Sequence, residues 1–240
     1  GIRVIRTYPT LERLPVPTNT LANGDMDLYR FKVTAPADGD IGLYKFTFRI
    51  SSTSVATTSS FRVFAYSTSD FGTQAYAINP INSNDVSCVG GGSLELANTT
   101  NCNSNVQALG YASSSLFHIN VWFDPVTNTA ATPNAEAIQV PAGQSRYFKL
   151  VANVTRATAG DSFSAALVGD DSFFPTLTTP GGSGIADNAL SNASLVASSS
   201  RFVWSPDTTT TSATTSNDWL NGYLLPGLPT TEMSQQTFSK

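Results

Sequence analysis

The stretch Ile41–Ile50, IGLYKFTFRI, decides the fold class. Bulky apolar side chains stand at alternate positions, and polar side chains stand between them. The apolar set is Tyr44, Phe46, Phe48 and Ile50, and the polar set is Lys45, Thr47 and Arg49. Successive side chains of a β-strand point to opposite faces, so this period of two predicts a strand with one buried face.

The same period recurs along the chain. It is found in MDLYRFKVTA, SFRVFAYS, LFHINVWF, SRYFKLVANV, SFSAALVG and RFVW. Turn-forming residues separate these stretches, as in NGD at 23–25, PAGQ at 141–144 and PGGSG at 180–184. No amphipathic helix of useful length is present. We therefore expect an all-β protein, an antiparallel β-sandwich of jelly-roll type.

The organisation expected from this pattern is one domain with two extensions. Residues 1–17 form an N-terminal β arm, residues 18–229 the sandwich, and residues 230–240 a C-terminal tail. A segment at about 67–112, rich in Ser, Asn and Gly, is expected to be a long excursion on the surface. Phe238 is the apolar anchor of the tail, and it docks either on its own domain or on a neighbouring copy.

Composition points to an extracellular protein. Charged residues make up 12%, about half of what a typical soluble domain carries, while 40% are hydrophobic and the net charge is −4. No basic stripe with interleaved aromatic residues is present, which argues against nucleic acid as a partner. No apolar stretch approaches the roughly 20 residues of a membrane span. Because the chain begins at Gly1 rather than Met, we expect that a leader has been removed.

Two cysteines and three sequons bear on secretion. Cys88 and Cys102 are predicted to close a small disulfide loop, with two unpaired thiols as the alternative. Asn98, Asn153 and Asn192 stand in Asn-x-Ser/Thr sequons and are candidate glycosylation sites.

The sequence offers no catalytic constellation, so we expect no enzyme and no cofactor. His118 is the single histidine, and no Gly-x-Ser-x-Gly elbow accompanies it. Two Cys without a nearby His do not make a metal site. Aspartates at 37–40, ADGD, and 168–172, VGDDS, are explained by turn chemistry, with a structural Ca²⁺ as the weaker alternative.

Three blocks carry a resemblance to known proteins. FVWSPDTTTTSATTSNDWLNGYLLPGLP, GDIGLYKFTFRI and VPAGQSRYFKLVANV resemble recurrent blocks in uncharacterised secreted proteins of candidate-phyla, ultrasmall bacteria. That resemblance implies a cell-surface location. In plan, a jelly-roll body behind an N-terminal β arm is similar to fibre subunits of the TasA and camelysin type. Those subunits donate an N-terminal strand to the next subunit, although here Pro9 interrupts the arm.

The arm has two interpretations: it is the first strand of its own sandwich, or it is donated to a neighbouring copy. In the second case the chain is a subunit of an extracellular filament or surface layer, assembled head to tail from copies of itself. The residues of such an assembly arm are Ile2, Arg3, Val4, Ile5, Arg6, Tyr8 and Leu11. The alternative function is a carbohydrate-binding or adhesive surface module that binds glycans through aromatic side chains. The candidates are Trp122, Trp204, Trp219 and Tyr223.

Overall fold

The computed structural model describes residues 5, 7–52, 57–77, 79–81, 106–109, 116–123, 137–171, 201–206 and 219–240. All regular elements in these ranges are β-strands. None of the described residues belongs to a helix long and apolar enough to cross a membrane.

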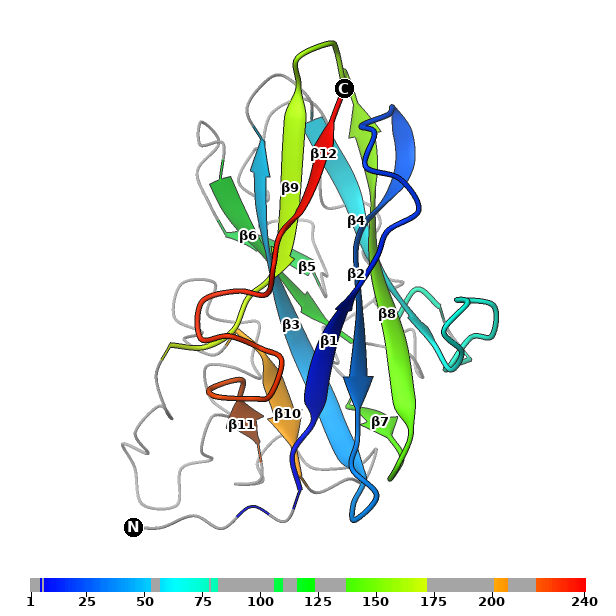
Figure 1. Ribbon diagram of the computed structural model, residues 1–240, viewed down its shortest axis with the longest axis vertical. Coiled ribbons are helices and arrows are strands. Elements are labelled where there is room, and N and C mark those ends of the chain that lie inside the picture. Colours follow the sequence, from blue (N-terminus) through cyan, green and yellow to red (C-terminus); the bar gives the residue numbers. More distant parts are fainter. Residues whose placement is uncertain are drawn as a thin grey trace, which may run out of the picture.

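One sheet has four strands, all paired antiparallel (Figure 1). Its order is β1 (Thr10–Leu14), β2 (Gly24–Thr34), β8 (Ser145–Thr155) and β4 (Thr57–Tyr66). β8 lies between β2 and β4, although more than a hundred residues separate β2 from β8 in the sequence. β8 thus takes its place in this sheet by long-range pairing, whereas β1 and β2 are consecutive in the chain.

The second sheet is built around β3, Ile41–Ser52. Its other strands are β5 (Val106–Leu109), β6 (Leu116–Trp122), β7 (Ile138–Val140), β9 (Ser162–Leu167), β10 (Val203–Ser205), β11 (Leu220–Asn221) and β12 (Gln236–Ser239). β3 pairs with β6 and β7 along one edge and with β9 and β10 along the other. β3, the strand with the clearest alternation in the sequence, is therefore the central strand of the second sheet.

Aromatic rings join the two sheets. The Phe46 ring of β3 lies 5.1 Å from the Phe31 ring of β2 and 5.1 Å from the Phe148 ring of β8, measured between ring centroids. All three side chains are fully buried. The antiparallel β-sandwich expected from the sequence is thus confirmed.

β3 differs from the prediction on its second face. Lys45 and Thr47, expected to face solvent, are 0% and 2% exposed. The alternation itself is present, but chain segments cover both faces over this part of β3. A period of two tells which side chains share a face and not whether that face is covered.

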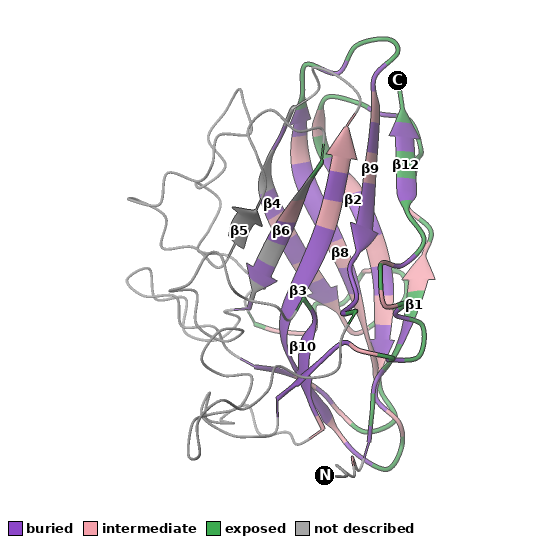
Figure 2. Cartoon of the chain, turned by 90° about the vertical axis from the view of Figure 1, so that its left-hand side faces the viewer, coloured by how far each residue is buried: buried purple, intermediate pink, exposed green. Residues whose placement is uncertain are grey.

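Parts of both predicted extensions form strands that pair within this chain. β1 pairs with β2 of the same chain, with Leu11 opposite Val33, so the segment 10–14 is an edge strand of the first sheet. The segment 236–239 is strand β12, which lies beside β9 and pairs with it (Figure 2). Phe238 of β12 is buried near Phe163. Phe238 therefore docks on its own domain. In each case burial of one apolar side chain secures a short edge strand.

A glycine fixes the position of β1. The Leu11 amide donates a hydrogen bond to the Pro226 carbonyl oxygen at 2.8 Å, which brings β1 against the loop that follows β11. A Cβ on Gly227 would lie 1.7 Å from the Leu11 carbonyl oxygen, and Gly227 has φ +82°. Only glycine permits this approach between the two backbones.

We predict that Gly227→Ala is more destabilising than Gly160→Ala. Both glycines adopt positive φ, so each substitution should cost about 1–2 kcal/mol of backbone strain. Gly160 has open space around it, whereas at Gly227 the added methyl group clashes with Leu11. Urea unfolding of both variants measures the difference. Equal losses of unfolding free energy would show that the contact with β1 contributes nothing.

Candidate functional site

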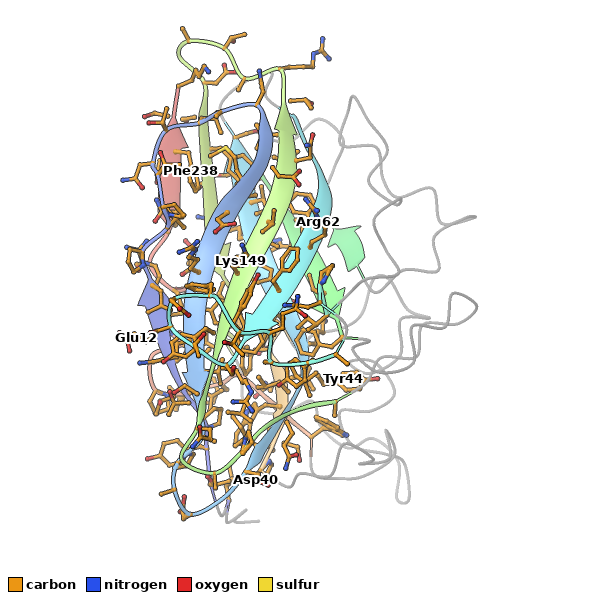
Figure 3. All side chains as sticks on the ribbon, turned by 90° about the vertical axis from the view of Figure 1, so that its right-hand side faces the viewer. Glu12, Asp40, Tyr44, Arg62, Lys149 and Phe238 are labelled. Carbon is orange, nitrogen blue, oxygen red and sulfur yellow. The ribbon has the colours of Figure 1, made fainter. Side chains whose placement is uncertain are left out.

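The solvent-facing side of the four-stranded sheet carries aromatic and cationic side chains in cross-strand rows. In the first row Lys32 of β2, Tyr147 of β8 and Tyr66 of β4 lie opposite one another. The next row is Arg30, Lys149 and Phe64, and the third is Asp27, Val151 and Arg62. Figure 3 shows this side with Lys149 and Arg62 labelled. Because β2, β8 and β4 are in register, residues that are distant in the sequence form one surface.

The loop after β4 adds a further ring to this surface. Phe71 lies 5.4 Å from the Tyr66 ring and 6.3 Å from the Tyr147 ring, both edge to face. The Arg30 guanidinium stacks on Phe71 at 4.3 Å from the ring centroid. Lys149 Nζ lies 5.4 Å from the Phe64 centroid and 5.6 Å from that of Tyr66. These cation–π contacts fix the orientation of the rings.

We call this surface the aromatic face. It consists of Arg30, Lys32, Arg62, Phe64, Tyr66, Phe71, Tyr147 and Lys149. Its four aromatic rings are partly exposed, in contrast to the buried rings of the core. Large side chains left at the surface with fixed geometry are typical of binding sites.

Two carboxylates along one side of the aromatic face pair with three of its four cations. Asp27 pairs with Arg30 at 2.5 Å and with Lys149 at 3.4 Å, and Asp25 pairs with Arg62 at 2.5 Å. Hydrogen bonds from Arg62 and then Asn153 hold the pKa of the Asp25 carboxyl below its usual range. The face therefore presents paired charges and hydrogen-bonding groups beside aromatic rings.

The predicted assembly arm is only partly described. Ile2, Arg3, Val4 and Arg6 lie outside the described residues. Ile5 packs against the core of its own domain, and Leu11 is 5% exposed within it. Tyr8, in contrast, is 53% exposed. Leu11 is thus used inside its own sandwich because β1 pairs with β2.

The predicted sugar-binding aromatic residues do not form one platform. Trp204 and Trp219 are each 2% exposed, and the Trp204 indole N–H donates to the Asn221 carbonyl oxygen at 2.9 Å. Tyr223 is partly exposed, and the side chain of Trp122 lies outside the described residues. Both described tryptophans are therefore core residues.

The predicted modification sites are mostly outside the described part of the chain. Cys88, Cys102, Asn98 and Asn192 all fall there. The Asn153 side-chain amide donates to Asp25 Oδ1 at 3.0 Å, at one corner of the aromatic face.

His118 lies on β6, opposite Arg49 of β3. Its Nε2 is 3.4 Å from the Arg201 guanidinium. Burial, together with the charges of Arg201 and Arg49, lowers the pKa of His118. Among the described residues no group of three His, Cys, Asp or Glu side chains is placed to hold a metal ion.

Two ionisable side chains are buried in this part of the structure, Lys45 of β3 and Asp170, which follows β9. The Asp170 carboxylate accepts hydrogen bonds from the backbone amides of Arg201, Phe202 and Gly222 at 2.8–3.1 Å. Burial raises the pKa of Asp170, and burial lowers the pKa of Lys45 to about 7, an effect that the charge of Asp170 opposes. The three amides belong to segments next to β10 and β11, so Asp170 holds both strands in place.

Sequence reasoning missed the aromatic face because its rows cross three strands that are not neighbours in the chain. A signal was present in two of those strands. In SFRVFAYS and SRYFKLVANV, the positions that alternate with the buried residues hold both aromatic and cationic side chains. Placing the two sets side by side requires the pairing of β4 with β8.

Comparison with known proteins gives weak likenesses only. No protein-family model matches the chain, and no curated protein matches it. A solved structure described as BspA_C_WT matches with 14% identity and a TM-score of 0.24, over 68% of this chain and 45% of that one. A type II cohesin module from the ScaA scaffoldin of Acetivibrio cellulolyticus matches with 13% identity and a TM-score of 0.22, over 76% and 77%. The collagen-binding domain of a Staphylococcus aureus adhesin matches with 7% identity and a TM-score of 0.21, over 70% and 87%. At these TM-scores the likenesses carry no argument about what this chain binds.

We predict that the free energy of unfolding rises between pH 7 and pH 9 because of Lys45. Its pKa is about 7 in the folded chain and about 10.4 when exposed, so in this range the unfolded chain binds more protons. Urea unfolding as a function of pH measures the rise, and Lys45→Met should abolish it. Lys32→Met, at a lysine on the aromatic face, is the matched control and should retain it. An unchanged pH profile in Lys45→Met would contradict the assignment.

Proposed function

We propose that this chain is an extracellular β-sandwich binding module of adhesive type, and that its aromatic face binds a cell-surface glycan. The observation that carries the proposal is the set of partly exposed rings at Phe64, Tyr66, Phe71 and Tyr147, held by cations on a solvent-facing sheet. The extracellular location rests on the composition of the chain and on the resemblance noted for its three sequence blocks.

A glycan suits this surface because a sugar has an apolar ring side and polar hydroxyl groups, and the aromatic face offers contacts for both. The apolar side of a sugar ring packs on aromatic side chains, which combine an apolar body with a fixed shape. Its hydroxyl groups need hydrogen-bonding side chains nearby, and Asp25, Asn153 and Arg62 supply them along one side. The network of contacts holds these groups in place before a ligand arrives, which reduces the entropic cost of binding.

The filament hypothesis receives less support from the described residues. A donated strand must leave its own domain, but Thr7 and Leu11 are buried in it and β1 pairs with β2. An acceptor sheet also needs an open edge. The β4 edge is covered at Ala65, whose amide and carbonyl both bond the Asn79 side chain, and at Val63, whose carbonyl accepts from the Ile81 amide.

We predict that Tyr147→Ala weakens glycan binding about tenfold. Loss of one stacking ring should cost roughly 1.4 kcal/mol, which corresponds to that factor. A glycan array identifies the ligand, and calorimetry on the best ligand measures the affinity of each variant. Tyr223→Ala removes a partly exposed tyrosine away from the aromatic face and is the matched control. No binding at millimolar glycan, or equal losses in both variants, would reject the proposal.

A further inference from the structure

The charges at the centre of the aromatic face are unevenly matched. Asp27 is shared by two cations, Arg30 at 2.5 Å and Lys149 at 3.4 Å. Arg30 donates to Asp27 Oδ2 through two nitrogens, Nε and Nη2. Lys149 contacts the other oxygen, Oδ1, at a distance beyond the roughly 2.7–2.9 Å of a charge-assisted hydrogen bond. Arg30 is therefore the main partner of Asp27, and the charge of Lys149 is only weakly compensated.

The other two cations of the aromatic face each have a carboxylate of their own. Arg62 pairs with Asp25, and Lys32 pairs with Glu12 of β1, both at 2.5 Å. With Asp27, three carboxylates thus serve four cations, and no other carboxylate of the described residues contacts them. This group of paired side chains keeps one positive charge, although the chain as a whole carries −4.

Lys149 occupies the central position on this surface. It lies on β8, the strand between β2 and β4, with Arg30 opposite on one side and Phe64 on the other (Figure 3). Its Nζ is 5.4 Å from the Phe64 ring centroid and 5.6 Å from that of Tyr66, and its side chain is 20% exposed. A ligand that packs on these rings would therefore meet the ammonium group.

The polar groups that remain available around Lys149 are chiefly donors. An ammonium group has three N–H bonds, and this one has a single, long carboxylate contact. The hydroxyl groups of Tyr66 and Tyr147, in the neighbouring row, bond none of the described residues and can donate as well. Asp27, the nearest acceptor, is already used by Arg30. A surplus of donors and of positive charge suits a ligand that is rich in acceptors and negatively charged.

We propose, on the basis of the glycan-binding function proposed above, that the ligand of the aromatic face is an acidic glycan whose carboxylate or sulfate group binds Lys149. The sugar ring packs on Phe64 and Tyr66, and its anionic group accepts hydrogen bonds from Nζ and from a tyrosine hydroxyl. A neutral glycan would cover Lys149 without supplying the missing negative charge. Charge complementarity therefore sets the specificity of the face, while the rings supply contact area.

The first test compares acidic polymers with their own neutral forms in calorimetry on the full chain. One pair is polygalacturonate and its carboxyl-reduced form, and the other is carrageenan and its desulfated form. Wild-type protein should bind at least one acidic polymer about tenfold or more tightly than the matching neutral form. The pair that shows the difference tells whether the bound group is a carboxylate or a sulfate.

The second test removes the charge of Lys149. Lys149→Met keeps an unbranched side chain on the rings but no ammonium group, so it should abolish the preference for the acidic form. Lys240→Met removes the same charge from the last residue of the chain, outside the aromatic face, and should keep the wild-type preference. Thermal melting of both variants shows whether they are folded, and the wild-type comparison needs no variant at all.

The outcomes separate this inference from the proposed function. Equal binding of acidic and neutral forms by wild-type protein, or a preference that survives in Lys149→Met, would overturn the acidic ligand and leave glycan binding in place. Failure to bind either acidic polymer would also overturn it. Whether the face binds glycans at all is decided separately by the glycan array and by Tyr147→Ala.

Discussion

The packing of Phe46 between the two sheets is the contact on which the rest of the structure depends. Its ring meets Phe31 and Phe148 of the opposite sheet, and also Phe123 and Phe202 of its own side, with centroid separations of 4.7–5.3 Å. Interlocked rings tolerate little displacement, because protein interiors are packed as densely as organic crystals. This cluster therefore fixes how β2, β3 and β8 face one another.

The aromatic face follows from that core. Once Phe148 and Leu150 of β8 point inward, Tyr147 and Lys149 must point outward, because side chains alternate along a strand. A slip of β8 by one residue against β2 would move Tyr147 into the core and Phe148 into water. Core packing thus fixes the register of the strands that carry the proposed glycan-binding surface. Ion pairs such as Arg30–Asp27 then fix the positions of individual side chains on it.

The two ends of the chain cover edges of the sandwich, and the N-terminal segment also lines a pocket with the loop after β11. β12 is covered along its outer edge by the segment near Leu21, whose amide donates to the Ser239 carbonyl oxygen at 2.8 Å. β1 is held against Pro226 by Leu11, which brings the N-terminal segment next to the loop after β11. That contact between remote segments places Ile5 and Tyr8 beside Leu224 around one pocket. Covered edges of this kind protect a sheet from uncontrolled strand pairing.

The sequence by itself determined the strands and the alternation within them. The stretches containing Phe31, Phe46 and Phe148 were predicted as half-buried strands, and their inward residues are those of the core. Only the tertiary structure decided that β8 lies between β2 and β4, that Lys45 is buried, and that Leu11 completes its own sheet. Alternation is local, because it arises from the geometry of successive residues. Pairing and burial depend on which distant segment covers a face, and hydrophobic and aromatic residues alone do not specify that partner.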